Sequence, residues 1–205
     1  MRGNHFVVAV LLIVGVLAGT FIVYPQLPPV VSTVGPKWRL LVDMPTLMAL
    51  MLGLFWLLAS ISRKRFPVEN FARTYYFVML VIMALFAYFQ ILMLWAALAH
   101  VRNQNAWIMG GIFVTLGLLG NVMGRTRRNL LMGLRVPWAL AGERAWNAGS
   151  RRAGQIMVIA ALVGLVLTLA GANTWILLGV IVLAILVLNI YSLVSYKRLQ
   201  HENKS

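Results

Sequence analysis

The chain has 205 residues, of which 61% are hydrophobic, and its mean hydropathy is +0.87. A soluble domain of this length cannot bury so much apolar surface, so the composition excludes a soluble fold and indicates a membrane protein. The net charge of +14 would suit a nucleic-acid-binding protein, but the basic residues lie between long apolar runs. We therefore attribute them to membrane topology and expect no direct nucleic-acid contact. The absence of cysteine excludes disulfides and thiolate metal sites.

Long stretches without charge predict the membrane-spanning helices, because about 20 apolar residues are needed to cross ~30 Å of hydrocarbon. The stretch at residues 153–196 is long enough for two spans, with a turn at residues 171–174 between them. The predicted fold is therefore all-α, a polytopic membrane bundle of six transmembrane helices. The charge-free stretches are residues 5–24, 44–62, 74–101, 103–124 and 153–196.

The basic residues are distributed unevenly over the connections between these spans. With six spans, both termini and the connections after the second and fourth spans share one side of the membrane. Of the 18 Lys and Arg residues, all but Lys37, Arg39 and Arg102 fall on that side. The positive-inside rule then predicts that both termini lie in the cytoplasm. We expect a two-helix N-terminal module over residues 1–73 and a four-helix region over residues 74–205.

The first external connection is rich in proline and ends close to Trp38, which is expected to lie at the membrane interface. Asp43 stands two residues before Pro45, so we interpret Asp43 as the N-cap of the second span, with proline in its first turn. The alternative is that Trp38 and Asp43 form an external contact site for a cation or for the amine of a peptide.

A few small or polar residues stand out inside the predicted spans. Gln90 and Asn189 are expected to form hydrogen bonds between helices. Gly15 and Gly19 form a small-xxx-small pair, which suits close packing inside the bundle or, alternatively, a homodimer contact. The middle of each predicted span lacks acidic and basic residues, which argues against a proton relay.

Residues 125–152 contain seven arginines and a single acid, Glu143. Seven arginines would cost roughly 20 kcal/mol at the bilayer centre, so this segment is expected at the cytoplasmic surface. Pro137 is well placed to begin a helix, which predicts a short amphipathic helix at the interface between the fourth and fifth spans. Glu143 is expected to pair with Arg135 or with an arginine of residues 125–128, leaving other guanidinium groups for a phosphate or carboxylate.

The same segment resembles the signature of the SdpI family over residues 121–154. The resemblance consists of fixed residue types in the order GN, N, GxRxPW, E and W, followed by an arginine. The matching residues include Asn121, Asn129, Gly133, Arg135, Pro137, Trp138, Glu143, Trp146 and Arg151.

This resemblance implies a multi-pass protein of the bacterial cytoplasmic membrane that gives immunity to a secreted membrane-active peptide toxin. It also implies that the chain could hold a cytosolic repressor at the membrane, as some members are thought to do. Three departures put single roles in doubt. Ala139 stands where the family usually has threonine, Ser150 stands where it usually has histidine, and residues 24–43 lack the histidine often found there.

Two other functions stay open at this stage. The arginines would also suit a small transporter or a lipid-handling protein, in which they bind anionic lipid headgroups. An enzyme would have to use Glu143, Asp43 or Glu69 as a general base. The sequence shows no accompanying nucleophile, metal cluster or phosphate loop, so we predict no catalytic residues, no metal and no cofactor.

Overall fold

The computed structural model describes all residues except 1, 32–34, 63–71, 100–103, 124–142 and 203–205. It also leaves undescribed the side chains of residues 2–3, 62, 143–148, 192–193 and 195–202. The described residues form six helices that are long and apolar enough to cross a membrane, which confirms the predicted fold class. The helices are α1 (Arg2–Val23), α2 (Arg39–Ser62), α3 (Ala72–Leu98), α4 (Asn105–Met123), α5 (Glu143–Leu169) and α6 (Thr174–Glu202).

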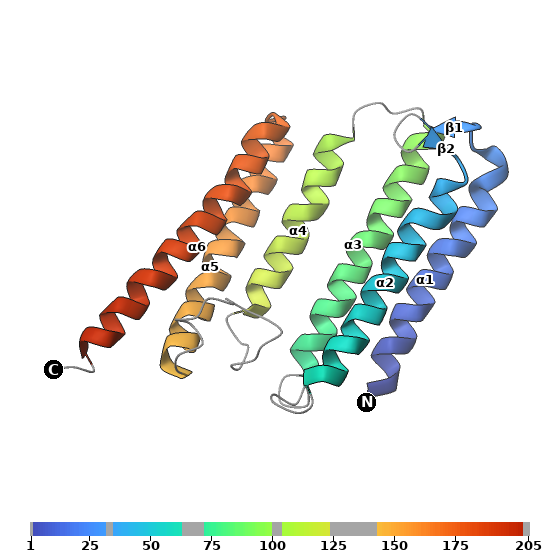
Figure 1. Ribbon diagram of the computed structural model, residues 1–205. Helices are drawn as coiled ribbons and strands as arrows, with labels where there is room; N and C mark the ends of the chain where they lie inside the picture. The colour runs from blue at the N-terminus through green and yellow to red at the C-terminus, as the bar shows by residue number, and fades with distance from the viewer. Residues whose placement is uncertain (1, 32–34, 63–71, 100–103, 124–142, 203–205) are drawn as a thin grey trace.

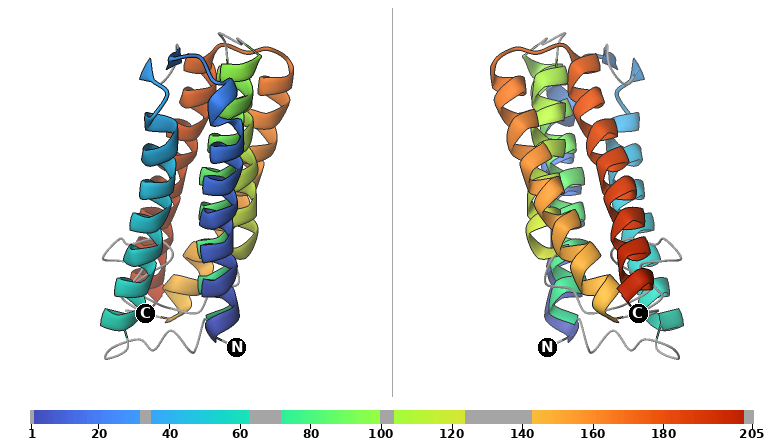
Figure 2. Two further views of the ribbon diagram at one scale, coloured as in Figure 1. Left: turned by 90° about the vertical axis from the view of Figure 1, so that its right-hand side faces the viewer. Right: turned by 90° about the vertical axis from the view of Figure 1, so that its left-hand side faces the viewer.

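The six helices pack as two groups of three, which Figure 1 shows side by side. In one group α3 packs against α1 and α2, in the other α5 packs against α4 and α6, and the groups meet where α3 contacts α4. Both chain termini lie at one end of the bundle, which we call the terminal end (Figures 1 and 2). The opposite end, which we call the hairpin end, carries the 3-10 helix η1 (Tyr24–Gln26) and an antiparallel pair of two-residue strands, β1 (Val30–Val31) and β2 (Gly35–Pro36).

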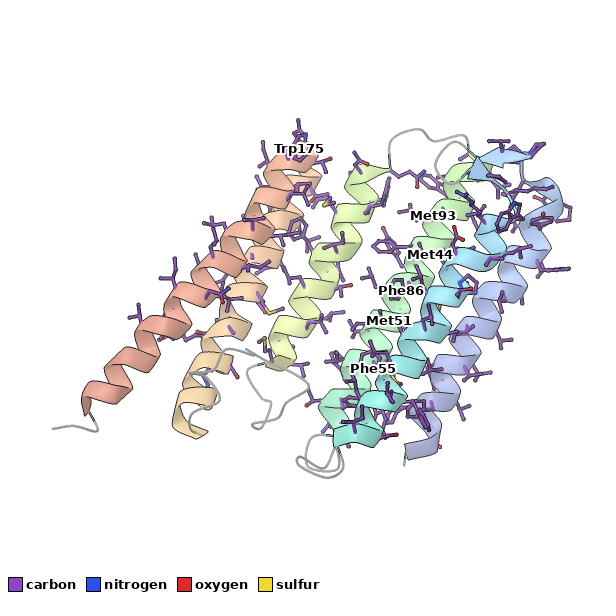
Figure 3. The ribbon with its side chains drawn as sticks, in the orientation of Figure 1. Met44, Met51, Phe55, Phe86, Met93 and Trp175 are labelled. Atoms are coloured by element: carbon purple, nitrogen blue, oxygen red, sulfur yellow. The ribbon has the colours of Figure 1, made fainter. Side chains whose placement is uncertain are left out.

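The buried core of the first helix group lies between α1, α2 and α3. Phe55 of α2 packs there among buried residues of α3 such as Tyr75 and Met79, with Met51 and Phe86 packed against the cluster (Figure 3). Most other large apolar side chains point outward, as expected where lipid is the solvent. Trp175, at the start of α6, is 78% exposed and lies at the hairpin end, where an interfacial aromatic residue is favoured (Figure 3).

The helix α2 begins earlier than the sequence indicated. It starts at Arg39, so Asp43 lies inside the helix and the prediction that it caps the N-terminus is wrong. Leu40 explains the earlier start, because it is 1% exposed and packs against Leu27 and Leu94. Because Leu40 is buried, the helix begins on the N-terminal side of Pro45. Pro45 then lies inside the helix, where its missing N–H removes one intrahelical hydrogen bond.

The turn between α5 and α6 lies where the sequence predicts it. Gly171 has a φ of 77°, a conformation that glycine adopts without steric cost. The N–H of Ala172 bonds to the carbonyl of Leu167 at 2.9 Å, and that of Gly171 to the carbonyl of Thr168 at 3.1 Å. This is the Schellman arrangement that closes a helix C-terminus. The Asn173 side chain then accepts a hydrogen bond from the N–H of Trp175 at 3.2 Å and caps α6.

Glycines bring α4 and α5 into close contact. A Cβ atom added to Gly120 would lie 2.8 Å from the Cβ of Met157 and 3.0 Å from the carbonyl oxygen of Gly154. Nearer the hairpin end, the buried ring of Phe113 covers Gly164. The two backbones can approach this closely only because the side chains between them are small.

The Gly15 and Gly19 pair of α1 does not take part in such a contact. A Cβ atom added at either position would meet no atom within 4 Å. The expectation that this pair packs inside the bundle is therefore wrong, and the alternative of a homodimer contact stays a prediction.

We expect Gly120→Ala to destabilise the bundle by about 1–3 kcal/mol, because the added methyl group would press on the backbone of α5. Gly53→Ala is the matched control, since a Cβ atom there meets no atom within 4 Å and alanine is the better helix former. Thermal unfolding of both variants in detergent, followed by circular dichroism, measures the difference. Equal or greater stability of Gly120→Ala would contradict the close contact.

Candidate functional site at the start of α5

The first turns of α5 lie beside the last turns of α4. The two helices run antiparallel, with Gly117 next to Ala161 and Gly120 next to Met157 and Gly154. Continuing this pairing toward the terminal end brings Met123, the end of α4, to the level of Gly154. The contact between α4 and α5 therefore determines where the first turns of α5 lie relative to the end of α4.

One face of α5 is buried and the other is exposed. Ser150, Ala153 and Gly154 are buried, at the spacing of a single helical stripe. Arg151 and Arg152 are exposed on the other side, and the Arg152 guanidinium donates a hydrogen bond to the Gln155 side chain at 3.3 Å. The arginines therefore stay accessible to an anionic group, while the small residues make the contact with α4.

Ser150 is 2% exposed, and its hydroxyl oxygen has no hydrogen-bond partner among the described residues. A buried hydroxyl without a partner destabilises a fold by roughly 1–3 kcal/mol. No local sequence signal indicates this burial, because serine next to two arginines is typical of a solvated turn.

The predicted interfacial helix takes a different form from the one expected. Residues from Glu143 to Arg152 are the first turns of α5 and continue into the membrane span without a break. The contact of α5 with Gly120 of α4 begins directly after these turns, at Gly154 and Met157. The part of the predicted helix before Glu143 lies outside the described residues.

The structure describes only part of the predicted motif. Asn121 is exposed in the last turn of α4, and Arg151 is exposed in α5. Glu143 and Trp146 lie in α5, but their side chains are not described, so the expected pairing of Glu143 with an arginine stays a prediction. The remaining motif positions lie outside the described residues: Asn129, Gly133, Arg135, Pro137 and Trp138.

The second candidate region, around Trp38 and Asp43, lies at the opposite end of the bundle. Both side chains are exposed, and the Arg39 guanidinium lies over the Trp38 ring, 5.9 Å from its centroid. Lys37 lies over the Tyr24 ring at 4.6 Å. These cation–π contacts keep two basic groups against aromatic rings at the hairpin end. The structure does not bring this region together with the arginines of α5.

Gln90 forms the interhelical hydrogen bonds that the sequence predicts, and the structure identifies the partners. Its side-chain nitrogen, fully buried, donates to the Thr20 hydroxyl at 2.9 Å and to the backbone carbonyl of Leu40 at 2.7 Å. One amide thus joins α1, α2 and α3. Asn189 behaves differently, because its side-chain nitrogen donates to the carbonyl of Ile185 within α6. The prediction of a bond between helices is therefore not met at Asn189.

Comparison with known proteins identifies the region that follows α4. Residues 125–192 match the model of the SdpI/YfhL protein family. This segment of the chain is similar to the SdpI family. It is also 40% identical over 86 residues to the Immunity protein SdpI of Bacillus subtilis (strain 168). That similarity covers 42% of this chain and 40% of the relative, so the similarity spans less than half of either protein. No solved structure matches the chain.

The SdpI-family segment includes α5 and most of α6. The sequence resemblance to the family, carried by residues 121–154, overlaps the first part of this match. In the part of the chain that the structure describes, no three His, Asp or Glu side chains lie together where they could hold a metal ion. The chemistry visible at the start of α5 is therefore that of exposed guanidinium groups beside a tightly packed pair of helices.

We expect Ser150→Ala to keep or raise the stability of the bundle, by up to about 1 kcal/mol, because it removes a buried hydroxyl that has no partner among the described residues. Ser150→Leu is expected to lower the stability by roughly 1–3 kcal/mol, since Ser150 is 2% exposed and overpacking a buried position is destabilising. Thermal unfolding in detergent distinguishes the two. A marked loss of stability in Ser150→Ala would show that the hydroxyl has a partner that supports the fold.

Proposed function

We propose that this protein is an immunity protein of the bacterial cytoplasmic membrane, giving resistance to a membrane-active peptide toxin. The observation that supports this most directly is the 40% identity over 86 residues to the Immunity protein SdpI. The six apolar helices agree with a multi-pass membrane protein. The family match over residues 125–192 falls on the arginine-rich segment and the two helices after it.

In this proposal the two ends of the bundle have different tasks. The hairpin end, with Trp38 and Asp43 exposed, faces outward and meets the peptide. The terminal end, with Arg151 exposed, faces the cytoplasm and carries the guanidinium groups. An acidic surface on a cytosolic repressor would bind such a cluster through bidentate contacts. The N-terminal module over residues 1–73 would then supply most of the outer surface.

Expression in a sensitive bacterium tests the immunity function. Cells making the wild-type chain are expected to survive a membrane-active peptide that kills cells with an empty vector. Arg135→Ala and Trp138→Ala are expected to abolish this protection without reducing membrane abundance. Both residues belong to the pattern at residues 121–154 that resembles the SdpI family, and alanine removes the guanidinium or the indole ring.

A matched pair on α5 makes the test sharper. Arg151 and Arg152 are neighbours with equal charge, and both are exposed, but only Arg151 belongs to the resembling pattern. We expect Arg151→Ala to weaken protection and Arg152→Ala to retain it. The minimal inhibitory concentration of the peptide, measured at equal protein level, decides the matter. Protection that is the same in all four variants and the wild type would refute a role for this region.

The orientation can be tested independently, because the chain has no cysteine that would react with a thiol probe. We expect Trp38→Cys to be labelled on intact cells by a membrane-impermeant maleimide, since this side chain is 52% exposed at the hairpin end. Arg152→Cys is expected to be labelled only after the membrane is permeabilised. The reverse pattern would overturn the cytoplasmic placement of the arginines.

A further inference from the structure

An apolar groove runs between α3 and α4 and reaches the last turns of α5. Its volume is about 960 Å³, and its lining is almost entirely apolar. Phe77 and Ala84 of α3, Gly110 and Val114 of α4, and Leu165 of α5 lie along it. The groove lies between the two helix groups, away from the exposed arginines of α5.

Aromatic contacts join the groove's two walls near the hairpin end. The Tyr88 hydroxyl on α3 donates a hydrogen bond to the backbone carbonyl of Trp107 on α4 at 2.9 Å. The Trp95 ring packs edge-on against the Trp107 ring, with the centroids 6.1 Å apart. From Phe77 to Tyr88 the groove follows α3 for about 16 Å, at 1.5 Å per residue. This length is about half of the ~30 Å hydrocarbon core, which is the depth of one leaflet.

A positive charge stands beyond the other end of the groove. Arg73 is exposed in the first turn of α3. It precedes Phe77 by four residues, so both lie on the same side of the helix. The apolar groove is about as long as one leaflet is deep, and a cation lies beyond its terminal end. This arrangement is complementary to an amphiphile with an anionic headgroup.

We infer that this groove binds the acyl part of an anionic phospholipid, with the phosphate of the headgroup at Arg73. An apolar groove of this size does not hold ordered water, because water needs polar partners. Hydrocarbon fills it instead, and each buried CH₂ group contributes to binding. The guanidinium then selects lipids with negative charge.

The length of the groove favours a lipid chain over a peptide helix. A transmembrane peptide needs about 20 residues to cross the core, which is a length of ~30 Å. The groove offers about half of that along α3, and its aromatic contacts join the two walls near one end. This inference does not depend on the proposed immunity function, because α3 and α4 form most of the groove and only its far end is lined by α5, within the SdpI-family segment.

Lipid retention by the full-length protein tests the inference. The protein is reconstituted in nanodiscs of equal phosphatidylglycerol and phosphatidylethanolamine, re-extracted in mild detergent, and its bound lipid is measured by native mass spectrometry. We expect the wild type to retain phosphatidylglycerol in preference to phosphatidylethanolamine. Arg73→Gln is expected to reduce retained phosphatidylglycerol about five-fold, as for the loss of one basic residue near an anionic lipid. Arg152→Gln, with the same charge change at the same end of the bundle, should retain the wild-type amount.

Filling the groove supplies a second, independent variant. Gly110→Leu places a side chain in open space, because an added Cβ atom there meets no atom within 4 Å, and it should displace both lipids. Gly179→Leu is the matched control on α6, with equally open surroundings. Ala84→Leu fills the groove from the other wall, should Gly110→Leu lose helical content. Lipid retention that is equal in the groove variants and their controls would overturn the inference, and so would a bound peptide in place of lipid.

Discussion

The close contact between α4 and α5 determines where the arginine-rich region sits. Gly120 leaves no room for a side chain between the two backbones, so the end of α4 and the start of α5 are held in one relative position. The same contact assigns the faces of α5. Gly154 and Met157 meet Gly120 of α4, and Arg151 and Arg152 are left on the exposed side. The accessibility of the guanidinium groups is thus a consequence of glycine packing in the neighbouring turns of α5.

A single buried amide has a comparable role in the first helix group. In the hydrocarbon core no water is present to satisfy a polar side chain, so Gln90 must find its partners within the protein. It bonds to Thr20 of α1 and to the backbone of α2, next to the buried side chain of Leu40. This interaction helps to join three helices that otherwise pack through apolar side chains. A buried amide therefore helps to set the relative positions of the helices in the first group. Closely packed glycines do so for α4 and α5 in the second group.

The arrangement separates the apolar and charged surfaces along the bundle. The exposed arginines lie at the terminal end of α5, and the aromatic contacts of Trp38 and Trp107 lie at the hairpin end. The groove between α3 and α4 lies between the two groups, and only the last turns of α5 bring residues of the SdpI-family segment to it. The proposed immunity function would use this separation, because it assigns a peptide to one end of the bundle and a cytosolic partner to the other.

The sequence alone determined the number of spans, their approximate positions, the turn at Gly171 and the family resemblance of the arginine-rich segment. These depend on local composition, because a charge-free run of sufficient length has few alternatives in a membrane. Only the tertiary structure decided the features that depend on contacts between distant residues. The burial of Leu40 moved the start of α2 ahead of Asp43, and the turns from Glu143 to Arg152 are continuous with the span of α5. Gly15 and Gly120 are both small residues in apolar helices, yet only Gly120 has a neighbouring backbone, and no local pattern distinguishes the two.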